Sequence, residues 1–111
     1  MEKLKSKFLI DLVFKKGRIL KYGYLALHYL EEPAGKEKMF LGVGVPKRFV
    51  QLAFKRNRIK RQIRAIIEQH KSELLVGLKP GSYMILYKGK STVDSHELSK
   101  DFKGLLKLFT T

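Results

Sequence analysis

The sequence predicts one α+β domain in which a small mixed sheet carries three helices. Segments whose apolar side chains alternate every two residues, as in strands, are interleaved with segments of helical period. The helical segments stand before, between and after the strands, an order typical of a sheet covered by helices. The 111 residues, of which 44% are hydrophobic, suffice for a single domain, 1–111, with a core of its own.

The first predicted helix spans residues 6–16. Ser6 is placed to cap its amino end, and Gly17 is placed to end it in the left-handed conformation. Apolar residues cover much more of its circumference than one stripe, which predicts burial on both sides, between the sheet and another helix. In the alternative interpretation, Phe14 and also Ile10 border an open groove.

Extended structure follows over residues 18–31, with a break at 22–23 and period-two alternation after it. The polar segment 31–38 contains Pro and Gly and is predicted to be a solvent-exposed hairpin loop. Residues 39–45 form the next strand, which is apolar enough to be buried on both faces.

A helix over residues 55–71 has two distinct faces when its side chains are placed at 100° intervals. One arc is apolar, at the spacing of a core-facing stripe, and consists of Ile59, Ile63, Ile66 and Ile67. The flank and the outer side are cationic. No acidic residue balances this charge, because no Asp or Glu occurs between Glu37 and Glu68.

The charge on this helix predicts an interface with an external polyanion. Like charges four residues apart repel, and a helix kept only for stability would interleave Glu with Lys. The run is mostly arginine, whose planar fork suits phosphate. The alternative is a solvated face without a partner. The candidate RNA-binding residues are Lys47, Arg48, Lys55, Arg56, Asn57, Arg58, Lys60, Arg61 and Arg64.

The basic helix is predicted to end near Leu75, and a turn at residues 79–81 leads into a strand over 82–88. The order strand, helix, strand predicts a parallel pair, and such crossovers are right-handed in about 98% of cases. The last helix begins at Asp94, with Glu97 at capping-box spacing, and keeps the helical period to the end of the chain.

Composition limits the classes of function. The net charge is +14, from 24 Lys and Arg against 10 Asp and Glu, an imbalance tolerated where a polyanion neutralises it. The chain has no Cys, which removes disulfides and thiol chemistry. No apolar run approaches a membrane span, and the first residues lack a signal-peptide pattern. A cytoplasmic protein without a membrane partner is expected.

No set of residues predicts catalysis by the protein alone. His28, His70 and His96 lie on three different elements, and no acidic cluster has metal-ligand spacing. We therefore expect no catalytic residue, no metal held by the protein alone and no small-molecule substrate.

The basic helix carries a specific motif, Arg56-Asn57-Arg58-Ile59-Lys60-Arg61, with Arg64 one turn later and a Lys-Arg pair upstream at 47–48. This run resembles that of the protein subunit of bacterial ribonuclease P. Residues 14–17, 41–48 and 83–88 are similar to further segments of that family. The resemblance covers nearly the whole chain.

The resemblance implies an α-β-β-β-α-β-α fold, shared with a ribosomal protein domain, in which the βαβ crossover is left-handed. It also implies a ribonucleoprotein endonuclease. A catalytic RNA, with Mg²⁺ bound mainly by that RNA, matures the 5′ end of precursor tRNA. The protein's basic helix docks on the RNA, and a groove between the first helix and the sheet holds the single-stranded 5′ leader of the substrate.

The implied groove residues are Ile10, Phe14 and His28. Groove positions that are often aromatic in the family are Ile10 and His28 here, which leaves Phe14 as the clearest stacking surface. The basic extensions of some members are missing. Two alternatives remain from other classes: a ribosomal-type structural RNA-binding protein without a catalytic role, and a DNA-binding module, for which no helix-turn-helix signal or dimerising heptad is found.

Overall fold

The computed structural model describes residues 2–31 and 38–110. The predicted hairpin loop at 31–38 lies almost entirely outside the described residues. The elements of the described part are β1 (Glu2–Lys3), α1 (Lys7–Lys16), β2 (Arg18–Tyr22), β3 (Leu25–Glu31), β4 (Met39–Gly44), α2 (Ala53–Gln69), α3 (Lys71–Gly77), β5 (Gly81–Tyr87) and α4 (Ser95–Thr110). The predicted α+β class is confirmed.

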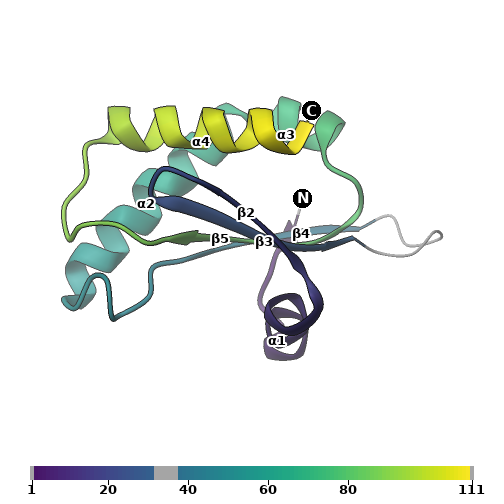
Figure 1. Ribbon diagram of the computed structural model, residues 1–111, viewed down its shortest axis with the longest axis horizontal. Helices are drawn as coiled ribbons and strands as arrows, with labels where there is room; N and C mark the ends of the chain where they lie inside the picture. Colours follow the sequence, from purple (N-terminus) through teal and green to yellow (C-terminus); the bar gives the residue numbers. More distant parts are fainter. Residues whose placement is uncertain (1, 32–37, 111) are drawn as a thin grey trace.

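The strands form one mixed sheet in the order β1-β4-β5-β3-β2. β4 and β5 are parallel, as predicted, whereas β3 pairs antiparallel with both β5 and β2. Helices α2, α3 and α4 cover one face of the sheet, and α1 lies on the other face, across the strands (Figure 1). The sheet therefore separates a layer of three helices from a single helix.

The connection from β4 to β5 crosses the sheet in the left-handed sense. In Figure 1 both strands run from right to left, β5 lies nearer the viewer than β4, and α2 and α3 pass above them. A chain on this path turns clockwise while it advances toward the viewer, which is a left-handed turn. The handedness implied by the family resemblance is confirmed, and the general right-handed preference is wrong for this chain.

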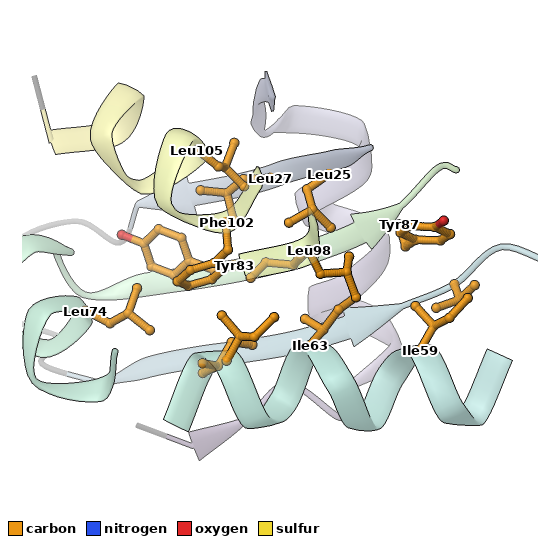
Figure 2. Packing of buried hydrophobic residues seen from close by; sticks show 14 of the residues in the cluster. Leu25, Leu27, Ile59, Ile63, Leu74, Tyr83, Tyr87, Leu98, Phe102 and Leu105 are labelled. Carbon is orange, nitrogen blue, oxygen red and sulfur yellow. The ribbon is translucent and has the colours of Figure 1, made fainter. Parts of the chain in front are cut away.

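The hydrophobic core fills the space between the sheet and helices α2, α3 and α4 (Figure 2). Alternate residues of the central strands point into it, because side chains along a strand alternate between the two faces. The predicted isoleucine stripe of α2 is buried in this core, which confirms the helical period of that segment. The core side chains labelled in Figure 2 are Leu25, Leu27, Ile59, Ile63, Leu74, Tyr83, Tyr87, Leu98, Phe102 and Leu105.

The prediction that α1 is buried on both sides is wrong. Only Val13 is buried among its residues, Phe8 is 73% exposed, and no other helix of the described chain packs on its outer surface (Figure 1). The apolar residues of α1 exceed what one contact face can cover. The alternative interpretation, in which Phe14 borders an open surface, fits the structure.

Both ends of α1 were predicted at the right residues. The Ser6 hydroxyl accepts a hydrogen bond from the N–H of Leu9, 3.4 Å away, as an amino-terminal cap does. Gly17 ends the helix, but in extended backbone (φ −78°) instead of the predicted left-handed conformation. Glycine is required there for space: a Cβ would lie 2.3 Å from the Val13 carbonyl oxygen and 2.6 Å from that of Tyr29.

Strand β4 is half-buried throughout, so the predicted burial on both faces is wrong. On its outer side it is paired only with the two-residue strand β1, an element that no sequence pattern indicated. On the side toward α1, Gly42 and Gly44 leave room for Met84 and Leu86 of β5, whose side chains lie 2.7–2.8 Å from where a Cβ would be.

The predicted single helix from 55 to about Leu75 is in fact two helices, separated at His70. The His70 ring Nδ1 lies 3.0 Å from the Ile66 carbonyl oxygen, and the ring packs against that of Phe102. His70 has φ −108° and ψ 16°, so the helical path turns there. The turn allows Leu74 of α3 to enter the core.

The final helix begins as predicted. The Asp94 carboxylate accepts a hydrogen bond from the N–H of His96 at 3.2 Å, and Leu98 is fully buried beneath the first turn. The Asp101 carboxylate further along α4 accepts a hydrogen bond from the N–H of Tyr24 at 3.1 Å, which ties α4 to the turn between β2 and β3.

Candidate nucleic-acid interface

Helix α2 holds the predicted basic residues on its side away from the core. Its buried isoleucines fix the rotation of the helix about its axis, because they occupy the arc that faces the sheet. Asn57, Arg58, Arg61 and Arg64 are exposed, and Lys55, Arg56 and Lys60 are half-buried at the flank. Lys47 and Arg48 are exposed in the turn after β4, where the Arg48 guanidinium lies 5.0 Å from the centre of the Phe49 ring.

Within residues 2–31 and 38–110, no carboxylate forms an ion pair with this basic face. The ion pair that the described residues do contain joins Lys71 and Glu68 at 3.9 Å, beyond the end of the basic run. The positive charges of α2 therefore remain available to an external anion, and their mutual repulsion remains uncompensated within the described chain.

Arg56 differs from the other cations because part of its guanidinium is used inside the protein. Its Nη1 donates to the carbonyl oxygens of Val50 at 3.0 Å and Gln51 at 2.6 Å. These bonds hold the connection between β4 and α2 against the first turn of α2. The sequence motif does not indicate this role, because the backbone path of residues 46–52 cannot be predicted from their sequence.

The second candidate surface is the sheet face below α1. The strand register places His28 between Ile19 and Met84, on the face opposite to Leu27. The Phe14 ring approaches the His28 ring edge-on, with centroids 4.9 Å apart and an interplanar angle of 73°. Phe14 is 41% exposed, so one part of its ring contacts the sheet side and the rest is open to solvent.

His28 is buried, with 8% of its surface exposed, and its Nε2 has no hydrogen-bond partner among the described residues. Burial lowers the pKa of His28 below its usual value, and the positive charges of Lys88 and Lys21 lower it further. The ring is thus kept neutral and acts as an apolar support for Phe14.

Two cations beside this surface were not among the predicted site residues. Lys21 of β2 pairs with Ala26 of β3, and Ala26 pairs with Leu86 of β5. Lys88 comes two residues after Leu86 and therefore lies on the same side of the sheet. Burial lowers the pKa of Lys88, and so do the nearby charges of Lys21 and Arg48. The charge of Arg48 thus acts on Lys88 as well as on the approach to α2. Only the strand register brings these side chains together.

Ile10 lies one helical turn before Phe14 on α1. It lines a hollow of about 590 Å³ at the outer edge of β4, together with Gly42 and Met84. Arg64 of α2 lines the opposite side of the same hollow. Phe14 and His28 are in contact, and Ile10 lines the hollow beside Met84, which is the cross-strand neighbour of His28.

Known proteins match this chain in sequence and in fold. The family model described as Ribonuclease P matches residues 1–110. The chain belongs to the ribonuclease P family. The ribonuclease P protein component of Stutzerimonas stutzeri (strain A1501) is 40% identical over 67 residues, which is 60% of this chain and 49% of that protein. The match spans about half the length of this curated relative.

Two solved structures resemble this ribonuclease P family member along most of the chain. The RNase P protein of Staphylococcus aureus has a TM-score of 0.80 at 19% identity, covering 97% of this chain and 94% of that one, and shows the fold. The RNase P protein from Thermotoga maritima has a TM-score of 0.77 at 26% identity, with 97% of each chain covered.

The described part of this ribonuclease P family member contains no metal-binding cluster and no membrane-spanning helix. No three His, Cys, Asp or Glu side chains within it come together in a group that could hold a metal ion. No helix within it is both long and apolar enough to pass through a lipid bilayer. The residues that the structure does gather are cations and aromatic rings, which bind phosphate and bases.

Proposed function

We propose that this chain is the protein component of a ribonuclease P ribonucleoprotein. It binds the catalytic RNA and the 5′ leader of precursor tRNA, and it supports the Mg²⁺-dependent cleavage that matures the tRNA 5′ end. The observation that carries this proposal is the basic face of α2. Its cations have no carboxylate partner among the described residues, and the buried isoleucines of α2 keep this face turned away from the core. Membership of the family supports it.

The chain's own residues bind and position RNA in this proposal. Cations on α2 neutralise RNA phosphates. The surface formed by Phe14, Lys21, Arg48 and Lys88, here called the leader surface, holds the single-stranded leader. Mg²⁺ supplies the Lewis acid and the activated water, and it is held mainly by the RNA. The described residues offer no cluster of three ligands for it, so the protein contributes orientation of the substrate.

The proposal is tested by adding the protein to the catalytic RNA at low Mg²⁺, with a precursor tRNA that carries a leader. We expect cleavage to appear at a Mg²⁺ concentration at which the RNA alone is inactive, because the protein replaces part of the metal's charge neutralisation. Cleavage that is unchanged by the protein would overturn the proposal and would favour a purely structural RNA-binding role.

The protein without RNA is expected to cleave nothing. Among the described residues, no three His, Cys, Asp or Glu side chains form a group that could hold a metal ion to activate water. The measurement is incubation of nuclease-treated protein with labelled precursor tRNA and Mg²⁺, with the reconstituted ribonucleoprotein as the positive control. Mg²⁺-dependent cleavage by the RNA-free protein would show that this division of labour is wrong.

The variant Phe14→Leu tests the leader surface. Leucine retains most of the apolar volume but has no π-face, and stacking of one base is worth roughly 1–3 kcal/mol. Because Phe14 is 41% exposed, we expect little change in melting temperature. Affinity of the holoenzyme for precursor tRNA should fall about 5-fold or more, while affinity for mature tRNA should hold. Equal losses for both tRNAs, or a lower melting temperature alone, would instead assign Phe14 to the core.

A further inference from the structure

A hollow beside the basic face of α2 is lined by residues that belong mostly neither to the basic motif nor to the leader surface. Its volume is about 300 Å³, and it lies between the first half of α2 and the turn formed by residues 91–94. Figure 1 shows the connection from β5 to α4 at the same end of the molecule as the first turns of α2. The hollow is separate from α1 and from the sheet face below it.

One wall of the hollow is an exposed aromatic ring next to two cations. Phe54 is 66% exposed, although burial of such a side chain is worth about 1.5–3 kcal/mol. Arg58 follows four residues later, so the two side chains are neighbours on the surface of α2, and Lys55 is adjacent in the chain. A ring beside cations is the combination with which proteins bind a base and its phosphate.

The remaining walls are an apolar floor and a polar rim. Ile59 and Val93 form the floor, and both belong to the core or pack against it. Gln62 donates through Nε2 to the Ser95 hydroxyl at 2.9 Å, which holds its amide in place. Asp94 uses Oδ1 to accept from the His96 N–H, and its other carboxylate oxygen can accept from the amino group of a base.

We propose that this hollow receives one unpaired nucleotide of the RNA that docks on α2. The base stacks on Phe54, and its phosphate lies against Lys55 and Arg58. The inference rests on the proposed function, because Arg58 belongs both to the hollow and to the basic face. RNA is the occupant that the charge favours, and proteins read RNA by stacking unpaired bases on aromatic rings.

The test compares Phe54→Leu with Phe8→Leu. Both phenylalanines are exposed on helices, but Phe8 lies on α1, away from the basic face of α2. Binding to the full-length catalytic RNA is measured by fluorescence anisotropy over a series of salt concentrations, beside a thermal melt. We expect Phe54→Leu to lose roughly 5- to 100-fold in affinity, with an unchanged salt dependence because no charge is removed. Phe8→Leu should bind as the unaltered protein does.

A tryptophan probe provides a second readout that does not depend on affinity. The chain contains no Trp, so Phe54→Trp introduces a single indole into the hollow. Its fluorescence should be quenched when the catalytic RNA is added, and its affinity should match that of the unaltered protein, because the ring is retained. The matched variant Phe8→Trp should show no quenching.

The outcomes separate this inference from the proposed function. Equal affinities of Phe54→Leu and Phe8→Leu, or an unquenched indole at position 54, would overturn the nucleotide site. If the arginines of α2 still proved necessary for RNA binding, the proposed function would stand. If removal of those arginines also had no effect, both would fail.

Discussion

Replacing Arg58, Arg61 and Arg64 together by alanine is expected to lower the affinity for the catalytic RNA roughly 100-fold at 0.1 M salt. All three side chains are exposed and have no carboxylate partner among the described residues. Each phosphate contact contributes about 0.7 to 0.9 to the slope of log affinity against log salt, so the slope should decrease by about 2 to 3. The measurement is equilibrium binding of the RNA at salt concentrations from about 0.05 M to about 0.3 M.

The matched control removes the same charge elsewhere. Lys79, Lys100 and Lys103 are exposed and lie outside α2, so their replacement by alanine should change the slope much less. Equal slopes for the two triple variants would mean that the RNA responds only to net charge, and would place the interface away from α2. Thermal melts of both variants should stay close to that of the unaltered protein, because none of the six side chains is part of the core.

Phe102→Ala is expected to cost about 3–5 kcal/mol of the free energy of unfolding. Phe102 is buried, and its ring contacts the His70 ring, with centroids 5.3 Å apart. A domain of this size has a stability of roughly 5–15 kcal/mol, so the loss would be a large share of the total. Urea unfolding followed by circular dichroism measures it.

Val76→Ala is the corresponding surface control. Val76 is 89% exposed on α3, and its truncation should change the free energy of unfolding by less than about 0.5 kcal/mol. If Phe102→Ala cost no more than Val76→Ala, the buried ring of Phe102 would not contribute to the stability of the core as expected.

Much of the fold could be predicted because local patterns and core packing agree in this chain. The isoleucine stripe of α2 correctly identified the side chains that this helix contributes to the core, and the period-two alternation correctly indicated β3 as a strand. The break at His70 was not predicted: the His70 ring packs against Phe102 of α4, more than thirty residues later in the chain, and local patterns do not indicate such a contact. The strand β1 is too short for any periodic pattern to indicate it.

The candidate site was predictable where one helix carries it and unpredictable where several elements do. Arg58, Arg61 and Arg64 share one surface because they share one helix. Lys21 and Lys88, in contrast, approach each other only through the pairing of β2, β3 and β5. The internal hydrogen bonds of Arg56 depend on the path of the preceding loop. This motif residue therefore uses part of its guanidinium to hold that loop, which the sequence did not indicate.

The isolation of α1 has a consequence for the order of the leader surface. Val13 is the one buried residue of α1, and the helices on the other face supply the core, so α1 is held to the sheet by fewer buried side chains than they are. A strand of RNA that contacts Phe14 and the sheet together binds only the docked arrangement, and so it increases the population of that arrangement. Under the proposed function, the leader would thus complete its own binding surface.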